Sequence, residues 1–189
     1  MSDLSDAVRI VLVRHGKPDG TWGQDPDPGL DDRGREQATT VARLMADLGP
    51  LPIMVSPLRR TRETAAPLAQ RWNVTPTIAA GVGELVAPPD PTPDHATWLH
   101  SLMSGIGADA PEVMTPFRNR VLRAIRSITT DTVVVTHFLA INAIVGEATG
   151  DDRVALFAPA HCSRTTVELA DGELSVVEFG ESAGGAPRA

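Results

Sequence analysis

The sequence holds a single cysteine, Cys162, which excludes an internal disulfide and a zinc site built on cysteines. It has no apolar run near the roughly 18 residues of a membrane span, and residues 1–9 contain no apolar core of the signal-peptide type. Basic residues are outnumbered, with 17 Lys and Arg against 24 Asp and Glu and a net charge of −7. This balance argues against general affinity for nucleic acid or acidic membranes. We therefore expect a cytoplasmic protein whose anion sites are local pockets.

The length of 189 residues suits one compact domain with a full hydrophobic core. We expect a single domain over residues 1–189, with flexible ends at 1–7 and 180–189. The His, Asp and Glu spacings form no metal-ligand motif, so we expect no metal and no cofactor. The composition gives no indication of an oligomeric state.

Apolar β-branched runs alternate with amphipathic helical patterns along the chain. The runs at 8–13 and 132–136 are typical of interior strands of a parallel sheet. This alternation predicts an α/β fold with three α/β/α layers and a mostly parallel central sheet. Further elements are expected as a short strand at 52–55, an edge strand at 74–78, a closing hairpin at 165–179, and helices from about Asp31, from a Ser56–Pro57 N-terminus, at 94–103, at 111–128 and at 138–145.

Two histidines directly follow the interior strands. Arg14 and His15 come after the first apolar run, and His137 comes after the run at 132–136. In open α/β sheets, ligands bind outside the carboxyl ends of the parallel strands. We therefore expect both imidazoles to face one cleft, next to a basic side chain.

Arginines also gather after the short strand at 52–55. In the segment 56–60 they fall within the first turn of the expected helix. The positive end of the helix dipole disfavours arginine there unless an anion is shared with the free N–H groups, which indicates a phosphate site. Solvated arginines without a ligand are the alternative. Helical periodicity alone places Arg62, rather than Arg60, nearer the buried stripe.

Four short motifs occur in order on these elements. They read Arg-His-Gly at 14–16, Leu-Asp-Asp-Arg-Gly-Arg-Glu-Gln-Ala at 30–38, Ser-Pro-Leu-Arg-Arg-Thr-Arg-Glu-Thr-Ala at 56–65 and Val-Val-Thr-His at 134–137, with Glu84 before the last. Together they resemble the histidine phosphatase superfamily, which includes the cofactor-dependent phosphoglycerate mutases and many small phosphatases. The resemblance extends over residues 8–179 and implies a phosphoglycerate mutase-like fold.

The resemblance implies a role for each of five residues. It makes His15 the nucleophile that becomes phosphorylated. Arg14, Arg60 and His137 would bind the phosphoryl oxygens, and His137 would also take part in catalysis. Glu84 would protonate the leaving oxygen and later activate water, the alternative being an idle, solvated loop glutamate. Neighbouring arginine charges favour the neutral imidazole that a nucleophilic histidine needs.

Five further residues are candidates for contact with the substrate. The resemblance places Lys17 where the family commonly has Glu or Gln, and Phe138 where Gly is frequent. Both differences change the charge or the width of the cleft, and so leave the substrate open. The candidates are Gly16, Lys17, Thr21, Phe138 and His161.

The implied function is phosphomonoester hydrolysis without a metal, through a phosphohistidine, by an enzyme similar to the histidine acid phosphatases. Its substrate would be a phosphorylated small molecule or a phosphoprotein. A phosphoglycerate mutase is the alternative enzyme, but the segment 79–111 is short and its 79–93 part, a predicted rim loop, is rich in proline, whereas mutases close over their substrate with longer inserts. A non-catalytic phosphate-binding module is the alternative outside enzymes.

Overall fold

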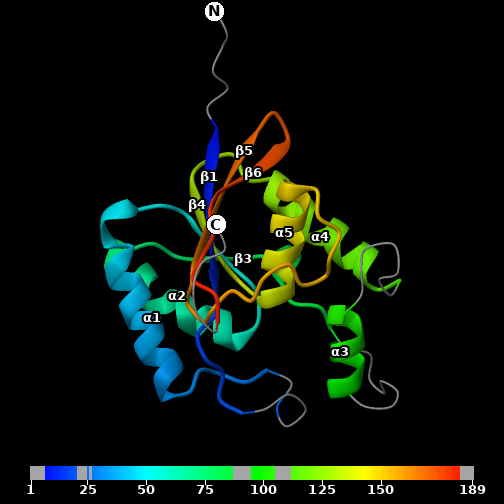
Figure 1. Cartoon of the computed structure of the whole chain (residues 1–189). Helices are drawn as coiled ribbons and strands as arrows, with labels where there is room; N and C mark the ends of the chain where they lie inside the picture. Colours follow the sequence, from blue (N-terminus) through cyan, green and yellow to red (C-terminus); the bar gives the residue numbers. More distant parts are fainter. Residues whose placement is uncertain (1–6, 21–24, 26, 87–94, 105–111, 184–189) are drawn as a thin grey trace, which may run out of the picture.

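The computed structural model describes residues 7–20, 25, 27–86, 95–104 and 112–183. A six-stranded sheet with the order β3-β2-β4-β1-β5-β6 forms its centre (Figure 1). The strands are β1 (Val8–Arg14), β2 (Ile53–Val55), β3 (Thr77–Ile78), β4 (Thr132–Thr136), β5 (Arg164–Ala170) and β6 (Glu173–Glu178).

The register of β1 against β4 determines where the histidines lie. These two strands are parallel, and Arg14 pairs with Thr136, so the residues that follow both strands emerge at the same edge. β2, β3 and β4 are also mutually parallel, whereas β5 and β6 are antiparallel. The prediction of a mostly parallel sheet with a closing hairpin is therefore confirmed. Asp171 and Gly172 form the hairpin turn, and both have positive φ, as a two-residue turn of this twist requires.

Helices cover both faces of the sheet (Figure 1). Alternate residues of β1 divide between the two cores, because Ile10 and Leu12 pack towards α4 and α5, whereas Val11 and Val13 pack towards α1 and α2. The three-layer α/β/α prediction is confirmed. The helices are α1 (Asp32–Leu44), α2 (Arg59–Trp72), α3 (His95–Ser104), α4 (Met114–Arg126) and α5 (Phe138–Thr149), with short 3₁₀ turns η1 (Ala46–Leu48) and η2 (Ala80–Val82).

The start of α2 differs from the prediction. Ser56 does not cap the helix, which begins at Arg59 after Leu58 and has no side-chain cap. The physical reason is that the Ser56 N–H still donates to the Val135 carbonyl of β4, so the N-cap falls at Leu58, two residues later than expected. The Ser56 hydroxyl is engaged elsewhere, as described below.

The C-terminal segment also differs from the prediction. Residues 180–183 were expected to be flexible, but Ala160 donates to Glu181 and Ala183 donates to Ala158, each at 2.7 Å. These backbone bonds fix the segment against the loop before β5, a pairing that no sequence pattern announces. The end segments 1–6 and 184–189 lie outside the described residues. Within the described parts, no helix has both the length and the apolar character needed to cross a membrane.

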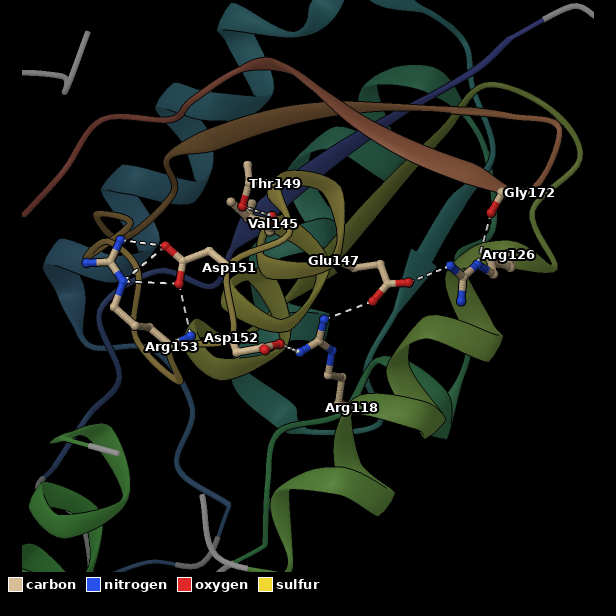
Figure 2. A network of polar contacts seen from close by, with 9 residues as sticks. All are labelled: Arg118, Arg126, Val145, Glu147, Thr149, Asp151, Asp152, Arg153 and Gly172. Atoms are coloured by element: carbon tan, nitrogen blue, oxygen red, sulfur yellow. Dashed lines mark hydrogen bonds and ion pairs between the residues drawn. The ribbon is translucent and has the colours of Figure 1, made fainter. Parts of the chain in front are cut away.

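A network of ion pairs joins α4 to α5 and to the hairpin (Figure 2). Glu147 on α5 accepts from Arg118 at 2.8 Å and from Arg126 at 2.7 Å. Arg118 also pairs with Asp152, and Arg126 donates to the Gly172 carbonyl in the β5–β6 turn. The network fixes α4 relative to α5, whose N-terminus lies at His137.

Candidate active site

The two histidines that follow β1 and β4 lie side by side. The ring centroids of His15 and His137 are 5.2 Å apart, and the side chains are 6% and 0% exposed. The His15 N–H donates to the Thr136 carbonyl at 3.0 Å, so the strand pairing continues up to the site. The prediction that both imidazoles share one place at the carboxyl edge of the sheet is therefore confirmed.

The hydrogen bond of His15 determines which ring nitrogen can react. His15 Nδ1 lies 2.8 Å from the Gly16 carbonyl oxygen, which can only accept. The proton therefore resides on Nδ1, and Nε2 carries the free lone pair. Burial lowers the pKa of His15 well below its usual value, and the charges of Arg60 and Arg14 lower it further. The ring is neutral at physiological pH, as a nucleophile must be.

Gly16 fixes the turn that carries His15. Its N–H donates to Thr64 Oγ1 at 2.9 Å, which ties the end of β1 to α2. A Cβ on Gly16 would lie 2.7 Å from the Gly34 carbonyl oxygen in the first turn of α1, so only glycine allows this approach. Gly16 thus positions the turn after His15 between α1 and α2.

Arg14 lies half-buried beside the histidines. Its Nη1 donates to the Pro159 carbonyl at 2.7 Å, and its guanidinium carbon lies 5.3 Å from the centroid of the Phe138 ring. Its Nε is buried and has no hydrogen-bond partner among the described residues, which leaves one N–H for a ligand.

Arg60, in the first turn of α2, is the second cation of the site. It is 9% exposed, whereas Arg62 is exposed, so the prediction from periodicity that Arg62 lies nearer the buried stripe was wrong. The buried arginine is the one that the resemblance selects. The reason is that α2 buries a double stripe that begins at Arg60 and Thr61, and Arg62 falls outside it. The expectation of merely solvated arginines fails for Arg60, because its side chain is buried next to the histidines.

Glu84 is buried, not a solvated loop residue. It is 8% exposed, and its carboxylate accepts from the Leu85 N–H at 3.0 Å and from the Leu139 N–H at 3.1 Å. Burial raises the pKa of Glu84, against the opposing effect of these two bonds and of the Arg60 charge. A carboxyl group with a raised pKa is suited to donating a proton.

This arrangement can be compared with known proteins. The family model described as histidine phosphatase superfamily (branch 1) matches residues 10–182. The chain belongs to this superfamily. Its fold also matches that of solved structures: a mycobacterial glucosyl-3-phosphoglycerate phosphatase in complex with inorganic phosphate aligns over 93% of this chain and 98% of that chain, with 22% identity and a TM-score of 0.74. That similarity shows the phosphoglycerate mutase-like fold.

Curated relatives match this chain over shorter stretches. The glucosyl-3-phosphoglycerate phosphatase of Mycobacterium tuberculosis is 38% identical over 116 residues, which are 59% of this chain and 48% of that protein. A PE-PGRS family protein of the same organism is 37% identical over 87 residues, which are 43% of this chain and 15% of that protein. The chain therefore spans less than half of either relative.

Ser56 sets the tautomer of His137 in this superfamily member. Its Oγ is fully buried, lies 2.8 Å from His137 Nε2 and already accepts from the Leu58 N–H. Among the described residues the hydroxyl proton has no other acceptor, so it goes to Nε2, and Nδ1 of His137 carries the ring proton. Nδ1 is buried and has no partner among the described residues. The geometry thus leaves an N–H donor for an oxygen of the ligand.

Replacing Ser56 by alanine is expected to lower kcat/KM for an aryl phosphate by about 10-fold, because a buried hydrogen bond that fixes His137 is lost. The measurement is steady-state phosphate release, compared with Ser127→Ala, a matched substitution on an exposed hydroxyl that only bonds the Ala124 carbonyl. Equal kinetics in both variants would show that Ser56 does not orient the imidazole.

Of the other predicted substrate contacts, two lie near the site, one is exposed and one lies outside the described residues. His161 lies near the site, with its ring centroid 5.6 Å from that of His15; burial, and next the Arg14 charge, lower its pKa to about 4. Phe138 packs on Arg14. Lys17 is exposed and pairs with Asp31 at 2.5 Å, so its charge is already partly neutralised. Thr21 lies outside the described residues.

Two hydroxyl groups of the site were missed as functional residues in the sequence. Ser56 and Thr64 bind His137 and the Gly16 backbone, respectively. Both belong to the motif at 56–65, so the motif marked the positions without showing their partners. Among the described parts of the chain, no group of three or more His, Cys, Asp or Glu side chains is arranged to hold a metal ion.

Proposed function

We propose that this histidine phosphatase superfamily member hydrolyses phosphomonoesters through a phosphohistidine on His15 Nε2, with no metal in the reaction. The observation that supports this most is the placement of a buried, neutral His15 beside His137, within the electrostatic reach of Arg14 and Arg60. The fixed arginine charges attract a phosphate dianion, and the neutral imidazole attacks its phosphorus atom.

In the first step, the lone pair of His15 Nε2 attacks phosphorus in line with the leaving oxygen. The N–P bond forms as the P–O bond breaks, and protonated Glu84 gives its proton to the leaving oxygen. The charge on the three equatorial oxygens is neutralised by Arg14 and Arg60, and the Nδ1–H of His137 donates a hydrogen bond to one of them.

In the second step, a water molecule attacks the phosphohistidine. The Glu84 carboxylate takes a proton from this water, the N–P bond breaks, and its electron pair returns to His15 Nε2. Inorganic phosphate leaves, and Glu84 is protonated again for the next cycle.

The pKa directions favour catalysis over a non-catalytic phosphate-binding module. A module that only binds phosphate gains from protonated histidines, but burial lowers the pKa values of both His15 and His137. Binding alone also gives no reason to bury a carboxyl group beside the anion, as Glu84 is buried here. A hydrolase uses both features.

A mutase is the second candidate enzyme. The two candidates differ in whether water reaches and hydrolyses the phosphohistidine. The rim segment 79–111 is short and rich in proline at 79–93, which favours hydrolysis. We propose a phosphorylated small molecule as substrate, with a phosphoprotein as the alternative, and a cytoplasmic location without nucleic-acid or membrane partners.

The test is a panel of phosphomonoesters, including nitrophenyl phosphate, sugar phosphates, 3-phosphoglycerate and glucosyl-3-phosphoglycerate, assayed for released phosphate. We expect release in the presence of EDTA and inhibition by vanadate, which mimics five-coordinate phosphorus between the two arginines. With 3-phosphoglycerate and a bisphosphoglycerate primer, phosphate release should exceed isomerisation. Loss of activity in EDTA with recovery in Mg²⁺ would contradict the mechanism, and 2-phosphoglycerate without comparable phosphate would make the chain a mutase.

A further inference from the structure

An arginine outside the phosphate-binding set grips the loop that carries Glu84. Arg120 lies on α4 and donates to four backbone carbonyls of this loop. Its Nη1 donates to Ala80 and, at 3.3 Å, to Gly81. Its Nη2 donates to Gly83 at 3.2 Å and to Glu84 at 3.4 Å. One guanidinium thus holds both η2 and the backbone of Glu84 itself.

The loop has little room to move away from α4. A Cβ on Gly81 would lie 2.5 Å from the Cβ of Ala124, so the loop backbone packs directly on the helix. On the other side, Thr136 Oγ1 donates to the Val82 carbonyl at 2.6 Å. The loop is therefore held between α4 and the end of β4, the strand that leads to His137.

The guanidinium is itself oriented by packing. Its central carbon lies 5.2 Å from the ring centroid of Phe117, one turn earlier on α4. The ion pairs of Glu147 with Arg118 and Arg126 fix α4 against α5 (Figure 2). The Leu139 N–H of α5 in turn donates to the Glu84 carboxylate. The backbone of Glu84 is thus held from α4 and its carboxylate from α5, and these two helices are fixed to each other.

We propose that Arg120 is a positioning residue for proton transfer by Glu84. It holds the backbone of the Glu84 loop, while the Leu85 and Leu139 N–H groups hold the carboxylate. Without Arg120, carbonyls that face α4 lose their donor, and the loop relaxes towards water. The carboxyl group then no longer meets the leaving oxygen within hydrogen-bond reach.

Arginine suits this place better than lysine. The planar fork of the guanidinium reaches carbonyls on both sides of the turn at the same time, whereas an ammonium is a point charge on a flexible stem. A lysine at position 120 would keep the charge and lose part of the grip. R120K therefore separates the effect of the hydrogen bonds to the loop carbonyls from the effect of the positive charge.

The kinetic test rests on the proposed function and compares R120Q with R123Q, which removes a charge from an exposed position of the same helix. We expect R120Q to lower kcat/KM for an alkyl phosphate by about 10- to 100-fold, and for nitrophenyl phosphate by less than about 3-fold, because only the alkoxide needs the proton. R123Q should change neither value. In the double variant R120Q/E84Q, the selective loss should not exceed that of E84Q alone.

Equal losses on both substrates in R120Q, or full addition in the double variant, would overturn the proposal while leaving the phosphohistidine mechanism in place. R120K should show a smaller selective loss than R120Q, and it provides the measurement if R120Q does not fold. A substrate ratio identical to wild type in R120K would contradict the role of the fork.

A second measurement does not depend on activity. Hydrogen exchange of the Gly83, Leu85 and Leu139 amides reports whether the loop and the Glu84 carboxylate are held. We expect faster exchange at these amides in R120Q, with unchanged exchange in β1 and β4 and no change in R123Q. Unchanged exchange at all three amides would overturn the positioning role even if the chain proved not to be a phosphatase, and so separates this proposal from the proposed function.

Discussion

Replacing His15 by alanine should lower phosphatase turnover by about 10⁴-fold or more, the scale expected when a covalent nucleophile is removed. Quenching the wild type with alkaline detergent after reaction with ³²P-labelled substrate should leave label on His15, and the label should be lost on mild acid treatment. The reason is that, of the two ring nitrogens of His15, Nε2 carries the free lone pair, since Nδ1 is bonded to Gly16, and the charges of Arg14 and Arg60 act on this ring.

His161→Ala is the matched control, because this imidazole lies 5.6 Å from His15 and is also buried in part. It should retain the label on His15, because only the nucleophile becomes phosphorylated, while its KM can change through the predicted substrate contact of His161. Label on Cys162 would refute the assignment. Burial raises the pKa of the Cys162 thiol to about 12, so the thiolate needed for attack is scarce near neutral pH.

Glu84→Gln should lower kcat/KM for an alkyl phosphate by about 10²- to 10⁴-fold, and for nitrophenyl phosphate much less. An alkoxide leaves only with a proton, whereas nitrophenolate leaves without one. The ratio kcat/KM covers the steps up to phosphorylation and is unaffected by slow hydrolysis of the phosphoenzyme.

The pH dependence of the same reaction checks the role of Glu84 independently. Because burial raises the pKa of Glu84, its acid form persists to higher pH than that of an exposed glutamate. In the wild type, kcat/KM for the alkyl phosphate should fall as pH rises through this raised pKa. The variant should lack this fall. Glu173→Gln, a change at an exposed position of β6, should keep it. Equal losses on both substrates in Glu84→Gln would mean that Glu84 donates no proton.

Much of the fold follows from the sequence, because strand and helix periods are local. The runs at 8–13 and 132–136 are interior strands, as their continuous apolar character predicts, and Asp31 caps α1 by accepting from Gly34 at 2.7 Å. The Asp171–Gly172 turn also needs only its own two residues. The start of α2 was misplaced because Ser56 serves partners that are distant in sequence.

The sequence by itself determined the types of group at the site. Motifs identified the two histidines, Arg14, the arginines after the short strand at 52–55 and the superfamily. Their shared position follows because residues at the carboxyl ends of parallel strands reach one edge of the sheet, whatever the details of packing. That inference placed Arg14, His15 and His137 together, as the structure has them.

Only the tertiary structure decided how these groups are held. The choice of Arg60 over Arg62 depends on which stripe of α2 faces the sheet, and the burial of Glu84 depends on an N–H from α5 and a guanidinium from α4. Neither can be read from local periodicity, because burial and hydrogen bonding of a loop residue are set by chain segments that lie 36 and 55 residues away. The protonation states on which the proposed chemistry rests are properties of that packing, not of the motifs.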